Sequence, residues 1–234
     1  MLKGMQRSFI AALPIMAGYL VLGIPCGILG TQAGMNLLQI ILMSILFYSG
    51  AGQYLIPNMW LTGVPVVSIV ASVSLVNSRQ ILYGASMSRF VQHAGKRQSF
   101  LFAATVTDES FGINLERFSN DENWSVPKAT GVNLLSLLSW TLANVTGALL
   151  GTLLSIPVAL ASFAMTSIFL CLLFTQTFNR ASLVAALAAA LGVLLCKLIG
   201  LDGPAIFLGA LVGIVAALLV GTGTKQSEKK KRKQ

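Results

Sequence analysis

Residues 129–156 read ATGVNLLSLLSWTLANVTGALLGTLLSI, a stretch without a single charged side chain. A helix of about 20 apolar residues crosses the hydrocarbon core of a bilayer, so this stretch is long enough to span one. Similar apolar segments recur along the chain, at residues 8–30, 36–60, 64–88, 99–113, 158–176, 181–199 and 204–222. The eight segments leave room for about six to eight crossings.

The composition agrees with a membrane protein. Of the 234 residues, 55% are hydrophobic and only 10% are charged, with a mean hydropathy of +0.79. Soluble domains carry about 25% charged residues, so this chain has too few charges to cover a water-facing globule. We therefore expect an all-α polytopic integral membrane protein. Residues 1–234 carry no fixed repeat and no separate soluble region, which predicts a single transmembrane domain.

The formal net charge of +9 is concentrated at the C-terminus, where six of the sixteen basic residues lie between Lys225 and Lys233. A basic cluster directly after an apolar segment marks the cytoplasmic end of a span and favours anionic lipid headgroups. Residues 225–234 are therefore predicted to form a basic cytoplasmic tail in contact with the lipid bilayer. A nucleic-acid partner is not expected.

Basic residues beside the apolar segments predict the orientation. Lys3 and Arg7 place the N-terminus inside, and residues 89–97 are also basic, yet three apolar segments separate these two regions. One of the three must therefore not cross. Segment 36–60 is the candidate, because small residues and Pro57 interrupt it. The expectation is about six full spans plus broken or re-entrant segments, with both termini inside, while segment 99–113 either spans or re-enters.

Three pairs of glycines are spaced four residues apart within apolar segments. This spacing lets two helix backbones approach closely. Packing between helices of this chain is the favoured interpretation, and a seam for a partner subunit is the alternative. The pairs are Gly23 and Gly27, Gly147 and Gly151, and Gly209 and Gly213.

Motifs of enzymes and of metal or cofactor sites are absent from the sequence. It contains no HExxH, no G-x-S-x-G, no phosphate-binding loop and no cysteine–histidine cluster with ligand spacing. The single histidine, His93, lies in a basic stretch and is interpreted as a solvated loop residue. We therefore expect a protein that moves or holds a molecule, without a cofactor, rather than an enzyme.

The first cluster of polar residues inside an apolar segment contains Tyr48, Ser49, Gly50 and Gln53. Small residues here favour an unwound backbone, whose carbonyl and amide groups can bind a zwitterionic substrate. These four residues are candidates for substrate binding. The alternative is a tight contact between helices in which the polar side chains bond to one another.

The second cluster contains Asn77, Arg79 and Tyr83. If this span is helical, Arg79 and Tyr83 lie on one face because they are four residues apart. A guanidinium group can bind a carboxylate with two parallel hydrogen bonds, so these residues are also candidates for substrate binding. The alternatives are that Arg79 extends toward lipid headgroups or forms a structural ion pair.

The third cluster contains Asp108 and Glu109, two adjacent acids after an apolar run. They could pair with Arg79, bind a substrate amine or carry a proton, so they are candidates for coupling or gating. The alternative is an ordinary helix N-cap at Thr107 or Asp108.

The order and spacing of these motifs resemble the AzlC family, the large subunits of branched-chain amino acid exporters. The resemblance covers most of residues 8–222, and no single motif carries it alone. Its matching pieces are Ala12-Leu13-Pro14, Gly23-x-Pro25-x-Gly27, Tyr48-Ser49-Gly50-Ala51-Gly52-Gln53, Asn77-Ser78-Arg79, Leu82-Tyr83-Gly84-x-Ser86, Thr107-Asp108-Glu109-Ser110, and Trp140 with Gly147.

The resemblance implies a secondary active exporter of leucine, isoleucine, valine and related amino acids such as methionine. It also implies a small AzlD-type membrane subunit as partner, a multi-pass location in the bacterial cytoplasmic (inner) membrane, and the proton gradient as driving force. Gln80 departs from the family, where a histidine often follows the arginine, and this puts proton coupling through that position in doubt. A channel or facilitator for another small solute is the alternative, and a non-transporting assembly or sensory subunit is a third reading.

Overall fold

The computed structural model describes residues 2–154, 157, 159, 163, 166–167, 170, 180–201 and 204–231. Over these ranges the chain forms helices and no strand, in agreement with the predicted all-α class. The helices are α1 (Leu2–Gln32), α2 (Leu37–Leu46), α3 (Gly50–Leu61), α4 (Val66–Asn77), α5 (Arg79–Val91), α6 (Lys96–Thr105), α7 (Asp108–Asn120), α8 (Val126–Leu153), α10 (Arg180–Leu198) and α11 (Ala205–Lys231).

The chain divides into two compact units. The first comprises Met1–Leu61 and Val76–Ile168, and the second comprises Thr62–Leu75 and Phe169–Gln234. That they form one transmembrane domain remains a prediction from the sequence.

Within the part of the chain that the structure describes, three helical stretches are long and apolar enough to cross a membrane: Gly4–Gln32, Val66–Val91 and Val126–Leu153. Two shorter apolar helices follow at Ser182–Leu198 and Ala205–Val220. Most of the predicted segment 158–176 lies outside the described residues, so six crossings with both termini inside remain a prediction. Helix α11 runs to Lys231, and the backbone of the predicted basic tail is therefore helical up to that residue.

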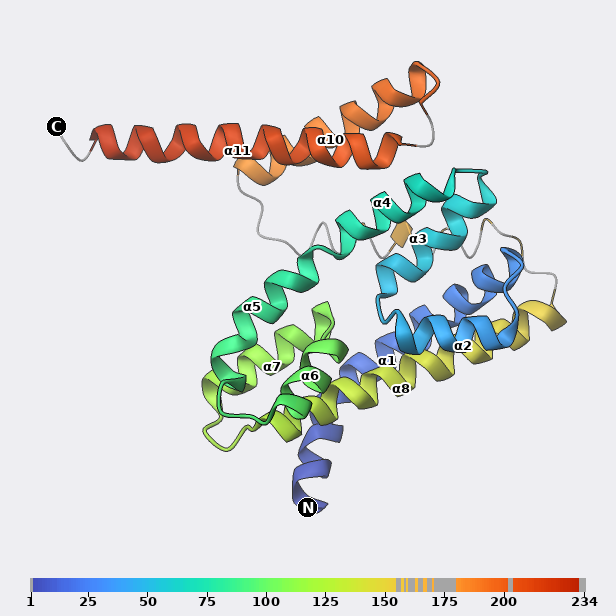
Figure 1. Ribbon diagram of the computed structural model, residues 1–234, viewed down its shortest axis with the longest axis vertical. Coiled ribbons are helices and arrows are strands. Elements are labelled where there is room, and N and C mark those ends of the chain that lie inside the picture. The colour runs from blue at the N-terminus through green and yellow to red at the C-terminus, as the bar shows by residue number, and fades with distance from the viewer. Residues whose placement is uncertain are drawn as a thin grey trace. The chain divides into compact units, whose positions relative to one another are not determined.

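Helices α1 and α8 lie side by side in the first unit (Figure 1). Ser8 donates a hydrogen bond to the carbonyl of Lys128 at 2.9 Å, and Ser139 donates one to the carbonyl of Met16 at 3.0 Å. Because the contacts follow the same order along both helices, α1 and α8 run parallel.

Glycines on both helices let the α1 and α8 backbones touch. A Cβ atom built on Gly27 would lie 2.0 Å from the carbonyl oxygen of Asn144, and one on Gly147 would lie 2.0 Å from that of Ile24. No side chain larger than hydrogen fits at such distances. The interpretation of these glycine pairs as packing sites within the chain is confirmed.

The third glycine pair behaves in the same way in the second unit, where α10 and α11 lie side by side (Figure 1). A Cβ atom on Gly209 would lie 2.9 Å from the carbonyl oxygen of Ala189, and one on Gly213 would lie 2.8 Å from that of Ala185. All three glycine pairs therefore pack helices of this chain against each other.

Segment 36–60 is interrupted, as the sequence predicted, but over a shorter stretch. Helix α2 ends at Leu46 and α3 begins at Gly50, so residues 50–53 form the first turn of α3 rather than an unwound strand. The turn forms because Ser49 caps it: the Ser49 hydroxyl accepts a hydrogen bond from the amide of Gly52 at 3.2 Å. Pro57 lies inside α3 and is buried there, so it removes one backbone donor without ending the helix.

Segment 99–113 contains a second interruption, between α6 and α7. Thr107 has an extended backbone and caps α7, in a capping box with Ser110. The N-cap predicted as one alternative for Thr107 is therefore present. By contrast, Ser78 between α4 and α5 keeps helical dihedral angles, with φ −55° and ψ −26°.

The close crossing of α1 and α8 makes a testable prediction about stability. Gly27→Ala must push the two backbones apart and should destabilise the protein by about 2 kcal/mol. Gly18→Ala on the same helix is the matched control, because a Cβ atom there meets nothing within 4 Å. Thermal unfolding of the purified protein in detergent should give a lower midpoint for Gly27→Ala alone, and equal midpoints for the two variants would contradict this packing.

Candidate functional site

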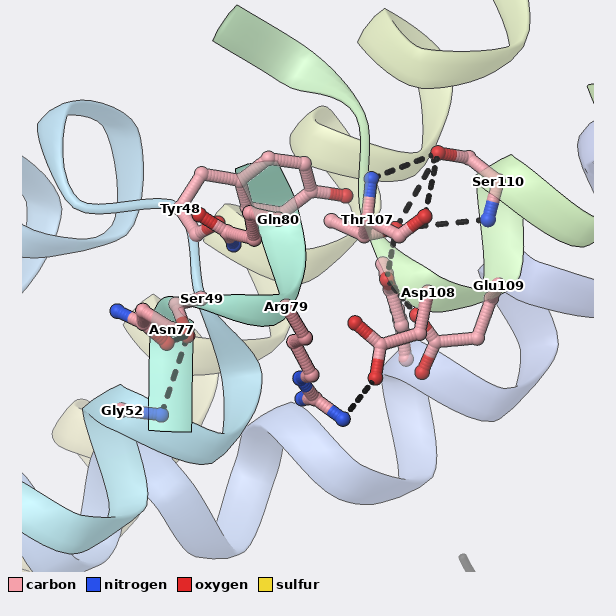
Figure 2. Close-up of polar contacts among 11 residues, drawn as sticks. Tyr48, Ser49, Gly52, Asn77, Arg79, Gln80, Thr107, Asp108, Glu109 and Ser110 are labelled. Atoms are coloured by element: carbon pink, nitrogen blue, oxygen red, sulfur yellow. Dashed lines mark hydrogen bonds and ion pairs between the residues drawn. The ribbon is translucent and has the colours of Figure 1, made fainter. Parts of the chain in front are cut away.

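The first two predicted clusters meet in the structure. The Ser49 hydroxyl donates a hydrogen bond to the side-chain oxygen of Asn77 at 2.6 Å, and the Gln80 amide reaches the carbonyl of Tyr48 at 3.5 Å. Figure 2 shows these residues at the junction between the α2–α3 break and the start of α5. Segments about thirty residues apart in sequence thus form one polar cluster.

An ion pair joins the second cluster to the third. Nη1 of Arg79, the first residue of α5, lies 2.5 Å from Oδ2 of Asp108, the first residue of α7 (Figure 2). The two side chains are 31% and 20% exposed, and the Arg79 Nε is buried without a hydrogen-bond partner among the described residues. One turn further along, the rings of Tyr83 and Phe111 stack with centroids 4.6 Å apart. Arg79 and Tyr83 therefore share one face of α5, as predicted, and that face meets α7.

Tyr19 of α1 is a central residue that the sequence reasoning missed. It is 5% exposed; its hydroxyl donates to Oε2 of Glu109 at 2.7 Å and lies 2.9 Å from the hydroxyl oxygen of Thr107. Its ring meets those of Tyr48 and Trp140 edge to face, at centroid distances of 6.4 and 5.1 Å. A lone phenol inside the first apolar segment was the available signal.

Tyr48 points toward the start of α7, where Thr107 lies (Figure 2). The Tyr48 side chain is buried, and its hydroxyl makes no hydrogen bond with the described residues. A buried polar group usually has a partner. Together with the Arg79 Nε, the hydroxyl leaves two hydrogen-bonding groups of the cluster unused.

Gln53 and Gly50 contact the end of α2 and Trp140 of α8, and they take no part in the Arg79–Asp108 ion pair. The fully buried Gln53 amide donates to the carbonyls of Met43 and Phe47, at 3.1 and 2.6 Å, and its oxygen accepts from the Trp140 indole at 2.8 Å. A Cβ atom on Gly50 would lie 3.5 Å from the Trp140 ring. These residues hold the end of α2 in place and pack the turn.

The charges of the cluster match those of a zwitterion. Arg79 supplies a cation and Asp108 an anion, while α3 and α7 both begin at this cluster. The N-terminal end of a helix carries a partial positive charge, which favours a carboxylate. No group of three or more metal-ligating side chains occurs within the described ranges, and His93 is exposed beyond the end of α5.

Two hollows in the first unit lie away from this cluster. One, of about 390 Å³, is lined by residues around the α1–α2 connection and the end of α8; the other, of about 660 Å³, lies between the starts of α1 and α8. Neither is lined by a residue predicted to bind substrate.

Comparisons with known proteins identify a family that this chain matches. Residues 14–154 match the family described as AzlC protein, a range that runs from within α1 to the end of α8. The branched-chain amino acid transport protein AzlC of Bacillus subtilis is 27% identical over 218 residues, 92% of this chain and 84% of that protein. The inner membrane protein YgaZ of Escherichia coli is 28% identical over 214 residues, 89% of this chain and 87% of that protein.

A membrane protein of Haemophilus influenzae is 28% identical over 213 residues, 89% of this chain and 85% of that protein. No solved structure matches the chain. The family match covers more than half of the chain and includes all three polar clusters, so this membrane protein belongs to the AzlC family.

Proposed function

We propose that this protein is a secondary active exporter of branched-chain amino acids, with Arg79 and Asp108 at its substrate site. The observation that carries the proposal is their ion pair, which joins the first residue of α5 to the first residue of α7 inside a membrane protein. Charged residues within membrane segments are costly and mark substrate or ion pathways. The Bacillus subtilis relative is named as a branched-chain amino acid transport protein, and this name indicates the substrate class.

Substrate binding exchanges the partners of the pair. The carboxylate of the amino acid takes the Arg79 guanidinium, which offers its unused Nε together with a terminal nitrogen for two parallel hydrogen bonds. Asp108, released from Arg79, accepts the substrate ammonium group. Because both charges of the protein stay paired throughout, the exchange avoids leaving an unpaired ion in the membrane.

The neighbouring polar residues orient the substrate, and the aromatic residues accept its side chain. Ser49, Asn77 and Tyr48 bring hydroxyl and amide groups to the same junction. The stacked rings of Tyr83 and Phe111 form an apolar wall one turn from the ion pair, suited to an aliphatic side chain. Gln53 and Gly50 contribute indirectly, because they fix the break that carries Ser49.

Glu109 is the candidate for coupling export to the proton gradient. It lies next to Asp108 and shares a hydrogen bond with the buried Tyr19 hydroxyl, so a change in its protonation is transmitted to α1. Gln80 lies at the same junction but cannot carry a proton there, since an amide does not titrate. The resemblance adds a small AzlD-type subunit and the bacterial inner membrane as the setting.

Leucine efflux tests the function. Cells loaded with radiolabelled leucine should lose it faster when they express this protein with an AzlD-type subunit than with an empty vector. Dissipating the proton gradient should abolish the difference, whereas a facilitator would keep its downhill flux. Equal efflux with and without the two subunits would exclude the proposed function.

A charge exchange separates substrate binding from a structural ion pair. Arg79→Asp and Asp108→Arg should each lower leucine efflux at least tenfold and also reduce the amount of folded protein, because each places two like charges side by side in the membrane.

The double variant Arg79→Asp/Asp108→Arg restores the pair. It should recover folded protein, measured by gel filtration of the detergent extract, while efflux stays low because the charges now face the substrate in the reverse order. Arg97→Ala, which removes an exposed arginine from α6, is the control for the loss of one charge. Recovery of efflux in the double variant would mean that the pair is only structural.

A further inference from the structure

Tyr19 lies near the middle of α1 and contacts Trp140, near the middle of the parallel helix α8. Because α1 and α8 are both long enough to span a bilayer, the contacts made along them give the depth of every other helix in the unit. On this scale, Tyr19 and Trp140 mark the centre of the membrane.

Helix α2 enters from the end of the unit where α1 ends. Ile40 packs near this end, because a Cβ atom on Gly30 would lie 3.3 Å from it. The last turn of α2 reaches the centre, since the Met43 carbonyl accepts from Gln53 and the Gln53 oxygen accepts from Trp140. Helix α2 therefore runs antiparallel to α1 and ends at mid-depth.

Helix α3 returns to the same end. Gly50, its first residue, faces the Trp140 ring at the centre. One turn later the Tyr54 hydroxyl donates to the carbonyl of Leu22 at 2.6 Å, beyond Tyr19 in the direction of the end of α1. Together α2 and α3 form a helical hairpin with its tip at the centre.

Helix α6 enters from the opposite end, where α8 begins. The Phe102 carbonyl of α6 accepts from Asn133, in the first third of α8, at 3.3 Å. Helix α6 then ends next to Thr107, whose hydroxyl meets that of Tyr19. Helix α6 therefore runs parallel to α8 and also ends at mid-depth.

Helix α7 goes back to where α6 started. Asn114 of α7 donates to Asn133 at 2.9 Å, the same residue that contacts α6. Asp121, just after α7, lies 3.7 Å from Arg7 at the start of α1. The α6–α7 hairpin thus mirrors the α2–α3 hairpin, with its tip at Tyr19 and both ends at the other side of the unit.

The lengths of the four helices fit half of a bilayer. They contain 10, 12, 10 and 13 residues, which corresponds to about 15–20 Å each, against a hydrocarbon core of about 30 Å. Charges identify the faces: no charged residue occurs between Arg7 and Arg79, whereas basic residues flank the α6–α7 hairpin. Its ends are therefore cytoplasmic, and those of α2–α3 face outward. Lys96, Arg97 and Arg117 lie in the terminal turns of this hairpin, and Arg89 and Lys128 lie just outside it.

We propose that α2–α3 and α6–α7 are two half-membrane hairpins that enter from opposite faces and act as the outer and inner gates of one pathway, with Tyr19 as the positioning residue between their tips. The gating role rests on the proposed function, while the sidedness of the hairpins does not. Different hydroxyl groups hold the two gates to α1. Tyr19 binds Thr107 and Glu109 of the inner hairpin, and Tyr54 binds α1 from the outer hairpin.

Sidedness is tested on the full chain, co-expressed with an AzlD-type subunit, after Cys26, Cys171 and Cys196 are replaced by serine. Single cysteines at Ala33 and Thr62 flank the outer hairpin, and those at Gln92 and Glu122 flank the inner one. A membrane-impermeant maleimide should label the first two in intact spheroplasts and the last two only in inside-out vesicles. If Ala33 and Thr62, or Gln92 and Glu122, are not labelled from the same side, that hairpin is a full crossing and the proposal fails.

Two matched variants test the gates. Tyr19→Phe removes the hydroxyl that holds the inner hairpin, so the cytoplasmic labelling rate of a cysteine at Val106 should rise about fivefold. Tyr54→Phe removes an equally buried hydroxyl from the outer hairpin, so it should instead raise outside labelling of a cysteine at Ala51. Both reporter positions are buried at a hairpin tip.

A general loosening of the structure would raise labelling at both positions in both variants, and that result, or no change at either position, would overturn the gate assignment. Leucine efflux is recorded in the same membranes but is not needed for the readout. If efflux is absent while labelling follows the expected pattern, the proposed substrate is wrong and the two hairpins stand.

Discussion

The direct contact between the α1 and α8 backbones is the constraint on which the rest of the first unit depends. Carbonyl oxygens of one helix lie where Cβ atoms would be on the other, so neither helix can rotate or slide without a clash. This fixes Tyr19 and Trp140 against each other at the centre of the pair. Tyr19 then contacts Tyr48, Thr107 and Glu109, and Trp140 contacts Gln53, so these two rings position residues on both sides of the candidate site.

The breaks between α2 and α3 and between α6 and α7 cost little free energy, because the freed backbone groups have hydrogen-bond partners inside the protein. An unsatisfied amide or carbonyl in hydrocarbon costs several kcal/mol. At the first break, the Gln53 side chain takes the carbonyls of Met43 and Phe47; at the second, Thr107 and Ser110 bond to each other's backbone amides. The protein can therefore interrupt its helices at both breaks while these backbone groups stay hydrogen-bonded.

Much of this could be predicted from the sequence, because it depends on local pattern. Apolar segment length predicted the helices, glycine spacing predicted the close crossings, and polar residues in apolar segments pointed to the three clusters. The residues at 50–53 were assigned to an unwound backbone, because sequence cannot tell a glycine that breaks a helix from one that packs at its start. The orientation of Gln53 away from the ion pair depends on Trp140, which is 87 residues away.

Tyr19 escaped prediction for the same reason. Its partners Thr107 and Glu109 are 88 and 90 residues further along the chain, and no local pattern connects them. A single tyrosine in an apolar segment could equally have been an aromatic residue at the lipid surface. Only the packing of the start of α7 against α1 gives its hydroxyl a role.

The pairing of α1 with α8 also has a consequence for how the protein is made. Ser8 and Lys128 are 120 residues apart, so α1 leaves the ribosome long before the surface it packs against has been synthesised. Until then, the Gln53 amide cannot reach the Trp140 indole, and the tip of the first hairpin lacks its final support. Such non-local contacts slow folding. During synthesis, α2 and α3 can therefore form their final contact with α8 only after most of the first unit has been made.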